Sequence, residues 1–110
     1  MGRNYEVVSA AQFSNEEGLG DWRALEEQAF GLFRTGDFAT GLRLVNEIGR
    51  LAEEADHHPD VILRYAVVEV RLSTHDTRSL TTADVALCRA ISAAAAELGV
   101  GADPSAVQSW

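Results

Sequence analysis

The segment from residue 38 to about residue 55 restricts the fold most, because its apolar residues recur every three or four positions. This spacing predicts an amphipathic helix that packs one face against other elements. Pro59 ends the pattern, since proline cannot continue a helix and biases the preceding residue toward extended backbone. The predicted inward stripe consists of Phe38, Leu42, Val45, Ile48, Ala52 and Ala55.

The residues after Pro59 change to a two-residue period, which is typical of strands. Segments 61–65 and 67–74 are predicted strands, and in the second of them Val68, Val70 and Leu72 alternate with polar residues. Period two places the valines and the leucine on the core and the polar set on the other face. His75 is in phase with the polar set, so it should point away from the core, toward a cleft or solvent.

The remaining elements complete an alternating pattern. A short helix over 9–17, strands over 22–25 and 29–33, and a last helix from Thr82 to Leu98 are predicted, with Gly99 as the helix stop. The order helix, two strands, helix, two strands, helix predicts an α+β domain over residues 1–99. Its four-stranded antiparallel sheet would carry all three helices on one face. Residues 100–110 are expected to form a mobile tail.

Composition excludes several classes of partner. The nine basic residues, all arginine, face 17 acidic residues, which gives a net charge of −8. Nucleic acid as a direct partner and an anionic membrane surface both need clustered positive charge. No apolar run reaches the ~20 residues of a membrane-spanning helix, and the N-terminus lacks a signal-peptide pattern. A cytoplasmic protein is expected, with the single cysteine, Cys88, as buried filler.

The three histidines lie in two short polar segments. His57 and His58 precede Pro59, and His75 ends a predicted strand. Histidine exchanges protons near neutral pH, since its unperturbed pKa is roughly 6.5. Three rings around a cleft suit general acid-base work on a small heterocycle. Glu53 lies one helical turn before His57, so the two share a face if the helix extends that far.

Simpler interpretations exist for each of these residues. Adjacent histidines can complement the dipole at a helix end, and Glu53 could be a solvated helix residue. Thr81 and Asp84 have the spacing of a capping box, which would explain Asp84 without catalysis. A zinc site is disfavoured, because adjacent histidines rarely bind one metal and no HxH or HxxxH spacing occurs.

These residues carry a resemblance to the pterin-4a-carbinolamine dehydratases, also called 4a-hydroxytetrahydrobiopterin dehydratases. The family pattern is met, with its spacing, by Glu53, His57, His58, Pro59, Tyr65, His75 and Asp84. Two positions depart from it. Ser79 replaces a usual glycine, and Val61 stands where an aromatic residue is common near the pterin.

The resemblance implies an α+β fold, a homodimer or homotetramer, and neither metal nor organic cofactor. The implied reaction removes water from a 4a-hydroxytetrahydropterin and gives the quinonoid dihydropterin, as part of tetrahydrobiopterin recycling. It needs one proton given to the leaving hydroxyl and one taken from a ring nitrogen.

The hypothesis assigns roles accordingly. His57 and His75 exchange the two protons, and His58 binds and orients the pterin. Glu53 and Asp84 support the histidines. Hydrogen bonds to the polar edge of the pterin are expected from Asp56, Ser73, Thr74 and Asp76.

The resemblance also supports a rival of another class, a non-catalytic dimerisation, assembly or regulatory module. Some relatives act as dimerisation partners of a transcription factor. Such a module has no reason to keep all three histidines, so their presence favours the enzyme. The segment after Leu98 also resembles the connector of relatives that carry a second, glyoxalase-like domain.

Overall fold

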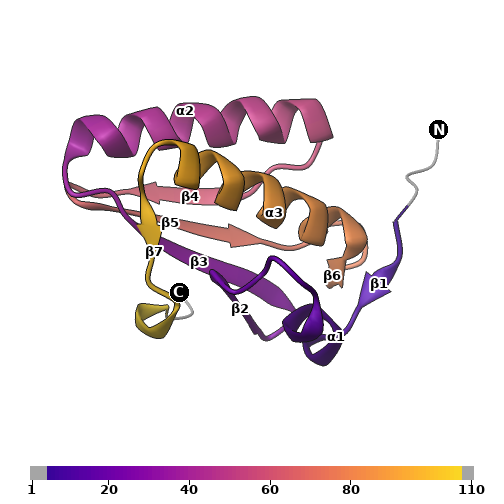
Figure 1. Cartoon of the computed structure of the whole chain (residues 1–110). Coiled ribbons are helices and arrows are strands. Elements are labelled where there is room, and N and C mark those ends of the chain that lie inside the picture. The colour runs from indigo at the N-terminus through magenta and orange to yellow at the C-terminus, as the bar shows by residue number, and fades with distance from the viewer. Residues whose placement is uncertain (1–4, 108–110) are drawn as a thin grey trace.

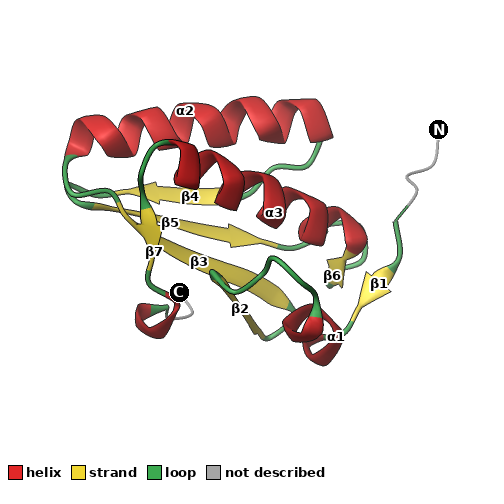
Figure 2. Ribbon diagram, in the orientation of Figure 1, coloured by secondary structure: helices red, strands yellow, loops and turns green. Residues whose placement is uncertain are grey.

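The computed structural model describes residues 5–107 and places two long helices across one face of an antiparallel sheet (Figure 1, Figure 2). The elements are β1 (Val7–Val8), α1 (Ala10–Asn15), β2 (Trp22–Leu25), β3 (Gln28–Arg34), α2 (Phe38–Ala55), β4 (Asp60–Leu63), β5 (Val67–Leu72), β6 (Leu80–Thr81), α3 (Thr82–Glu97), β7 (Gly101–Ala102) and the 3-10 helix η1 (Pro104–Ala106). The predicted α+β class and the order of the main elements are confirmed.

The main sheet has the strand order β2-β3-β5-β4, with every pairing antiparallel. It contains five strands, one more than predicted, because β7 pairs with the end of β3 that β2 does not reach. A separate two-stranded pair joins β1 to β6, directly before α3. Two-residue strands such as these have no periodic pattern that a sequence could reveal.

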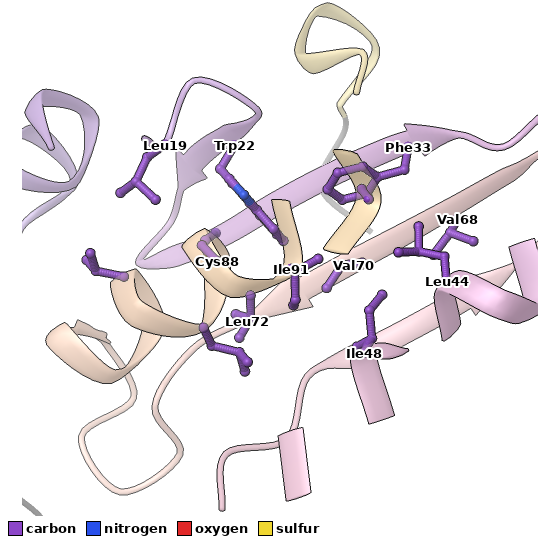
Figure 3. Packing of buried hydrophobic residues seen from close by; sticks show 14 of the residues in the cluster. Leu19, Trp22, Phe33, Leu44, Ile48, Val68, Val70, Leu72, Cys88 and Ile91 are labelled. Carbon is purple, nitrogen blue, oxygen red and sulfur yellow. The ribbon is translucent and has the colours of Figure 1, made fainter. Parts of the chain in front are cut away.

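The core lies between the sheet and the two long helices (Figure 3). Val68, Val70 and Leu72 of β5 are buried, as the two-residue period predicted. Trp22 of β2 packs edge-on against Phe33 of β3, with 5.7 Å between ring centroids. Gly31 makes this possible, since a Cβ there would lie 2.8 Å from the Trp22 ring.

The buried face of α2 differs from the predicted stripe. Phe38 and Leu42 are 48% and 46% exposed, and Ala55 is exposed too. Gly41 is the reason, because a Cβ at this position would meet Leu63 of β4 at 2.7 Å. The helix therefore turns its glycine toward the sheet. The buried row is Gly41, Leu44, Ile48 and Ala52.

The three helices do not cover the sheet equally. The long helices α2 and α3 cross it, whereas α1 lies beside β2 at one end (Figure 2). The predicted helix over 9–17 is shorter than expected, and Ser9 begins it through a capping box with Gln12. Phe13 of α1 still belongs to the common core. No helix within residues 5–107 is long and apolar enough to span a membrane.

The segment after α3 is more ordered than the sequence suggested. The Asp103 amide donates to the Leu32 carbonyl of β3 at 2.8 Å, and the Asp103 carboxylate forms an ion pair with Arg34 at 2.7 Å. These contacts join residues 101–106 to the sheet as β7 and η1. Residues 108–110 of the predicted mobile tail lie outside the described residues.

Candidate functional site

His57 is buried at the end of α2. The helix stops at Ala55, and Asp56 adopts the left-handed conformation with φ 50°. The His57 amide then returns to the Ala52 carbonyl at 3.0 Å. This turn moves His57 off the helix and directs its ring at α3, where Nε2 lies 2.6 Å from Asp84 Oδ1. The two side chains are 7% and 0% exposed.

Asp84 uses both of its carboxylate oxygens. Oδ1 pairs with His57, while Oδ2 accepts hydrogen bonds from the Thr81 amide and the Thr74 hydroxyl, each at 2.8 Å. The Thr81 contact is half of a complete capping box at the start of α3. The two interpretations of Asp84 are therefore compatible, because one carboxylate begins the helix and holds the histidine.

His58 takes the carboxylate that the sequence suggested for His57. Its Nε2 lies 2.6 Å from Glu53 Oε2, with the side chains 56% and 79% exposed. The conditional prediction that Glu53 and His57 share a face fails, because the left-handed turn at Asp56 ends the helical spacing before His57. Glu53 instead supports the neighbouring ring.

His75 stands in the loop between β5 and β6. The loop is closed by a bridge in which the Thr74 amide donates to the Ser79 carbonyl at 2.9 Å. Thr74 is buried and His75 exposed, so the ring points away from the core as the strand parity predicted. The next residue, Asp76, accepts a hydrogen bond from the Tyr5 hydroxyl at 2.9 Å.

The two histidine segments meet at one cleft of about 260 Å³. Its walls come from the turn after α2 and from the loop after β5. The lining residues are Asp56, His57, His58, Ser73, Thr74, His75 and Asp76. These are the seven residues that the sequence predicted as substrate contacts, while Glu53 and Asp84 hold two of the rings from behind.

The cleft is lined by three imidazole rings, which are side chains able to exchange protons. A carboxylate can only accept hydrogen bonds, so Nε2 of His57 is inferred to carry the hydrogen in its contact with Asp84 Oδ1. Nδ1 is then the nitrogen left to exchange a proton.

Within residues 5–107 no group of three or more His, Cys, Asp or Glu side chains is arranged to hold a metal ion.

The model of the pterin 4 alpha carbinolamine dehydratase family matches residues 6–94. The chain belongs to this family. The match includes both histidine segments and Asp84, whereas Tyr5 precedes it by one residue. The dehydratase family pattern therefore gave no signal for Tyr5, a neighbour of the cleft that was not predicted from the sequence.

Individual relatives agree with the family match. The chain is 39% identical over 71 residues to a candidate pterin-4-alpha-carbinolamine dehydratase of Chloroflexus aurantiacus, covering 64% of this chain and 76% of that one. A similarly named Cyanothece protein is 32% identical over 88 residues, covering 79% and 91%. The crystal structure of a transcriptional coactivator/pterin dehydratase from Brucella melitensis superposes with a TM-score of 0.74 at 26% identity, covering 82% of this chain and 99% of that one.

Proposed function

We propose that the protein is a 4a-hydroxytetrahydropterin dehydratase, a hydro-lyase that works by histidine acid-base catalysis. It would act in tetrahydrobiopterin recycling in the cytoplasm. The observation that carries the proposal is the convergence of all three histidines on one cleft. Membership of the dehydratase family supports the pterin as substrate.

The reaction requires two proton transfers and no nucleophile. The C4a–O bond breaks with its electron pair on oxygen, which takes a proton and leaves as water. A neighbouring ring nitrogen forms a double bond to C4a and loses its proton. Each transfer by a positioned group typically contributes about 10²- to 10⁴-fold. No step calls for a metal or an organic cofactor.

His57 and His75 are proposed as the two proton-exchanging rings. They line the cleft from two segments, His57 from the turn after α2 and His75 from the loop after β5. Asp84 fixes the orientation of the His57 ring, while His75 is exposed. His58, held by Glu53, orients the pterin, whose polar edge would bond to Asp56, Ser73, Thr74 and Asp76.

The test is the rate at which freshly generated 4a-hydroxytetrahydropterin loses water, followed by absorbance. His57→Gln and His75→Gln should each lower kcat about tenfold or more. His58→Gln is the matched variant, and it should raise KM more than it lowers kcat. Circular dichroism would check the fold of each variant. If the wild-type protein does not accelerate dehydration, the proposed function is wrong. If His57→Gln and His75→Gln each lower kcat less than about tenfold, the acid-base assignment is wrong.

The homodimer or homotetramer implied by the family is also a proposal. Among the described residues β4 is an edge strand with a single neighbour, and edge strands commonly pair with a second copy. Phe38 and Leu42 add two exposed apolar side chains on α2. Light scattering should give two or four times the chain mass of 11.9 kDa, and a monomer would contradict the proposal.

A second candidate function is a partner-binding module without catalysis. The Brucella melitensis structure favours keeping it, since that protein is described as a transcriptional coactivator as well as a pterin dehydratase. A titration with a reduced pterin separates the two candidates. Saturable binding supports the enzyme, and no saturable binding at millimolar pterin supports the module.

A further inference from the structure

The three histidines of the cleft differ in how their rings are held. His57 is paired with Asp84, and His58 is paired with Glu53. His75 stands at the exposed tip of the loop between β5 and β6, and no hydrogen bond to its ring is found among the residues that the structure describes. The position of this ring therefore depends on what holds the loop. Proton exchange is sensitive to that position, because the reacting groups must be aligned.

A hydrogen bond from the N-terminal segment ties the tip of this loop. At the base of the loop, the Thr74 amide donates to the Ser79 carbonyl at 2.9 Å. The tip, residues 75–78, is exposed throughout. Within the described part of the chain, a single hydrogen bond joins the tip to a residue outside the loop, and in it the Tyr5 hydroxyl donates to Asp76 Oδ2 at 2.9 Å.

Tyr5 is itself anchored to the start of α3. The strand β1 pairs with β6, which directly follows the loop (Figure 1). The Glu6 amide donates to the Thr82 hydroxyl at 3.1 Å, and the Thr82 amide donates to the Glu6 carbonyl at 2.9 Å. The same first turn of α3 carries Asp84, which holds His57. The N-terminal segment is therefore fixed to the part of the fold that holds His57.

Tyr5 is near both segments that carry the proton-exchanging rings. It lines a hollow of about 380 Å³ together with His57, and its hydroxyl contacts the residue next to His75. A tyrosine has two rotatable side-chain angles, so its hydroxyl is held at a low cost in conformational entropy. Asp76 keeps Oδ1 for the ligand, because a carboxylate accepts several hydrogen bonds.

We propose that Tyr5 is a positioning residue for His75, and that its hydrogen bond to Asp76 sets where the His75 ring stands relative to His57. The inference rests on the proposed dehydratase function, which makes these two rings the proton-exchanging groups. The Tyr5 hydroxyl acts through Asp76 and takes no part in either proton transfer.

Removing the hydroxyl tests the proposal in the dehydration assay. Tyr5→Phe keeps the aromatic ring and should lower kcat about fivefold, as expected for one lost hydrogen bond. Tyr65→Phe is the matched control, because the second tyrosine of the chain is 73% exposed and lines neither the cleft nor the hollow. Its kcat should stay within about twofold of wild type. Both variants should keep the wild-type melting temperature, since the Tyr5–Asp76 hydrogen bond is exposed.

A double-mutant cycle tests whether Tyr5 acts through Asp76. Asp76→Ala removes the acceptor, so adding Tyr5→Phe to this variant should change kcat by less than about twofold. If Tyr5→Phe lowers kcat by the same factor with and without Asp76, the route through Asp76 is wrong. A general structural role of Tyr5 would give this second, additive result.

The ring signal of His75 provides a measurement that does not depend on activity. In the nuclear magnetic resonance spectrum of the free protein, Tyr5→Phe should shift the His75 signal. The His58 signal should stay in place, because Glu53 holds that ring from α2. An unchanged His75 signal would show that Tyr5 does not position this ring.

The outcomes separate the two proposals. If the wild-type protein does not accelerate dehydration, the proposed function fails, and the positioning role of Tyr5 in catalysis fails with it. If the wild-type protein does accelerate dehydration but Tyr5→Phe keeps kcat within about twofold of wild type, the role of Tyr5 alone is wrong.

Discussion

Two histidine–carboxylate pairs stand at the end of α2, with the same contact distance in opposite surroundings. His57–Asp84 and His58–Glu53 each place Nε2 at 2.6 Å from a carboxylate oxygen. In the first pair the side chains are 7% and 0% exposed, and in the second 56% and 79%. Asp56 ends α2 in the left-handed conformation, and of the two residues that follow it His57 contacts Asp84 of α3 while His58 contacts Glu53 of α2.

The comparison shows that distance alone does not set the importance of such a contact. An exposed pair is screened by water and typically contributes about 1 kcal/mol or less. Removing one partner of a buried pair costs about 3 to 5 kcal/mol, because the other is left buried without compensation. Asp84 is also bound by Thr74 and Thr81, so the buried pair belongs to the fold as well as to the site.

The largest expected difference between the pairs follows from removing each carboxylate. Asp84→Ala should lower the free energy of unfolding by about 3 to 5 kcal/mol, since it removes the partner of His57 and the capping box of α3. Glu53→Ala, the matched variant, should cost about 1 kcal/mol or less. Urea denaturation measures both. Similar costs for the two variants would contradict the comparison.

A smaller effect is expected from the hydroxyl that supports Asp84. Thr74→Val keeps the shape of the side chain but removes the donor at 2.8 Å from Oδ2. The loss should be about 1 to 3 kcal/mol of unfolding free energy, because Asp84 remains buried. Thr77→Val in the same loop is the matched variant, since the hydroxyl of the exposed Thr77 bonds to the Thr74 carbonyl at 3.4 Å and to the Ser79 hydroxyl at 2.7 Å but not to a buried carboxylate. An equal, small effect of both variants would show that the network around Asp84 is weak.

The salt dependence of the unfolding free energy should also differ between the two pairs. At a pH of about 5, below the unperturbed pKa of histidine, replacing Glu53 by glutamine should lower the free energy of unfolding by about 0.5 kcal/mol at low salt. This difference should vanish near about 1 M salt, where exposed charges are screened. The cost of Asp84→Asn should persist, since buried groups are screened much less. Urea titrations at two salt concentrations measure this, and a salt-independent effect at Glu53 would be the contrary result.

The buried surroundings of Asp84 extend to Cys88, one turn further along α3. Burial raises the pKa of the Cys88 thiol well above its usual value, and the Asp84 charge raises it further. In the unfolded chain the thiol ionises near a pH of about 8.5. The stabilising contribution of the protonated Cys88 thiol is therefore present below that pH and is lost as pH rises above it.

Thiol labelling checks this at a pH of about 8. Cys88 should react with a disulfide reagent only as fast as the chain unfolds, and Asp84→Asn should speed the reaction. Rapid labelling of the native wild-type protein would contradict the burial of this region. The stability that is lost as pH rises above about 8.5 is the smallest of these effects.

Much of the fold could be predicted from periodicity. The bounds of α2, the buried face of β5 and the last helix follow from regular apolar spacing. The set of residues around the cleft was assigned with the help of the family resemblance. The prediction of the buried face of α2 was wrong, because a glycine carries no apolar signal. Close packing against Leu63 nevertheless places Gly41 inward.

Other features could not be predicted for physical reasons. Glu53 pairs with His58 and not with His57, which the sequence had suggested. This depends on the left-handed conformation of Asp56, which no sequence pattern reveals. The strands β1, β6 and β7 have two residues each, too few for any period. Tyr5 reaches the cleft through a contact 71 residues away in sequence, with Asp76.

The most direct test of the account uses the fact that the chain has three histidines in all. Each ring gives its own signal in a nuclear magnetic resonance spectrum, and substitution of each histidine assigns it. On titration with 7,8-dihydrobiopterin, the signals of His57, His58 and His75 should all shift, with one common saturation curve. If the rings do not shift, or if only one shifts while the others stay unchanged, the three histidines do not form one pterin site.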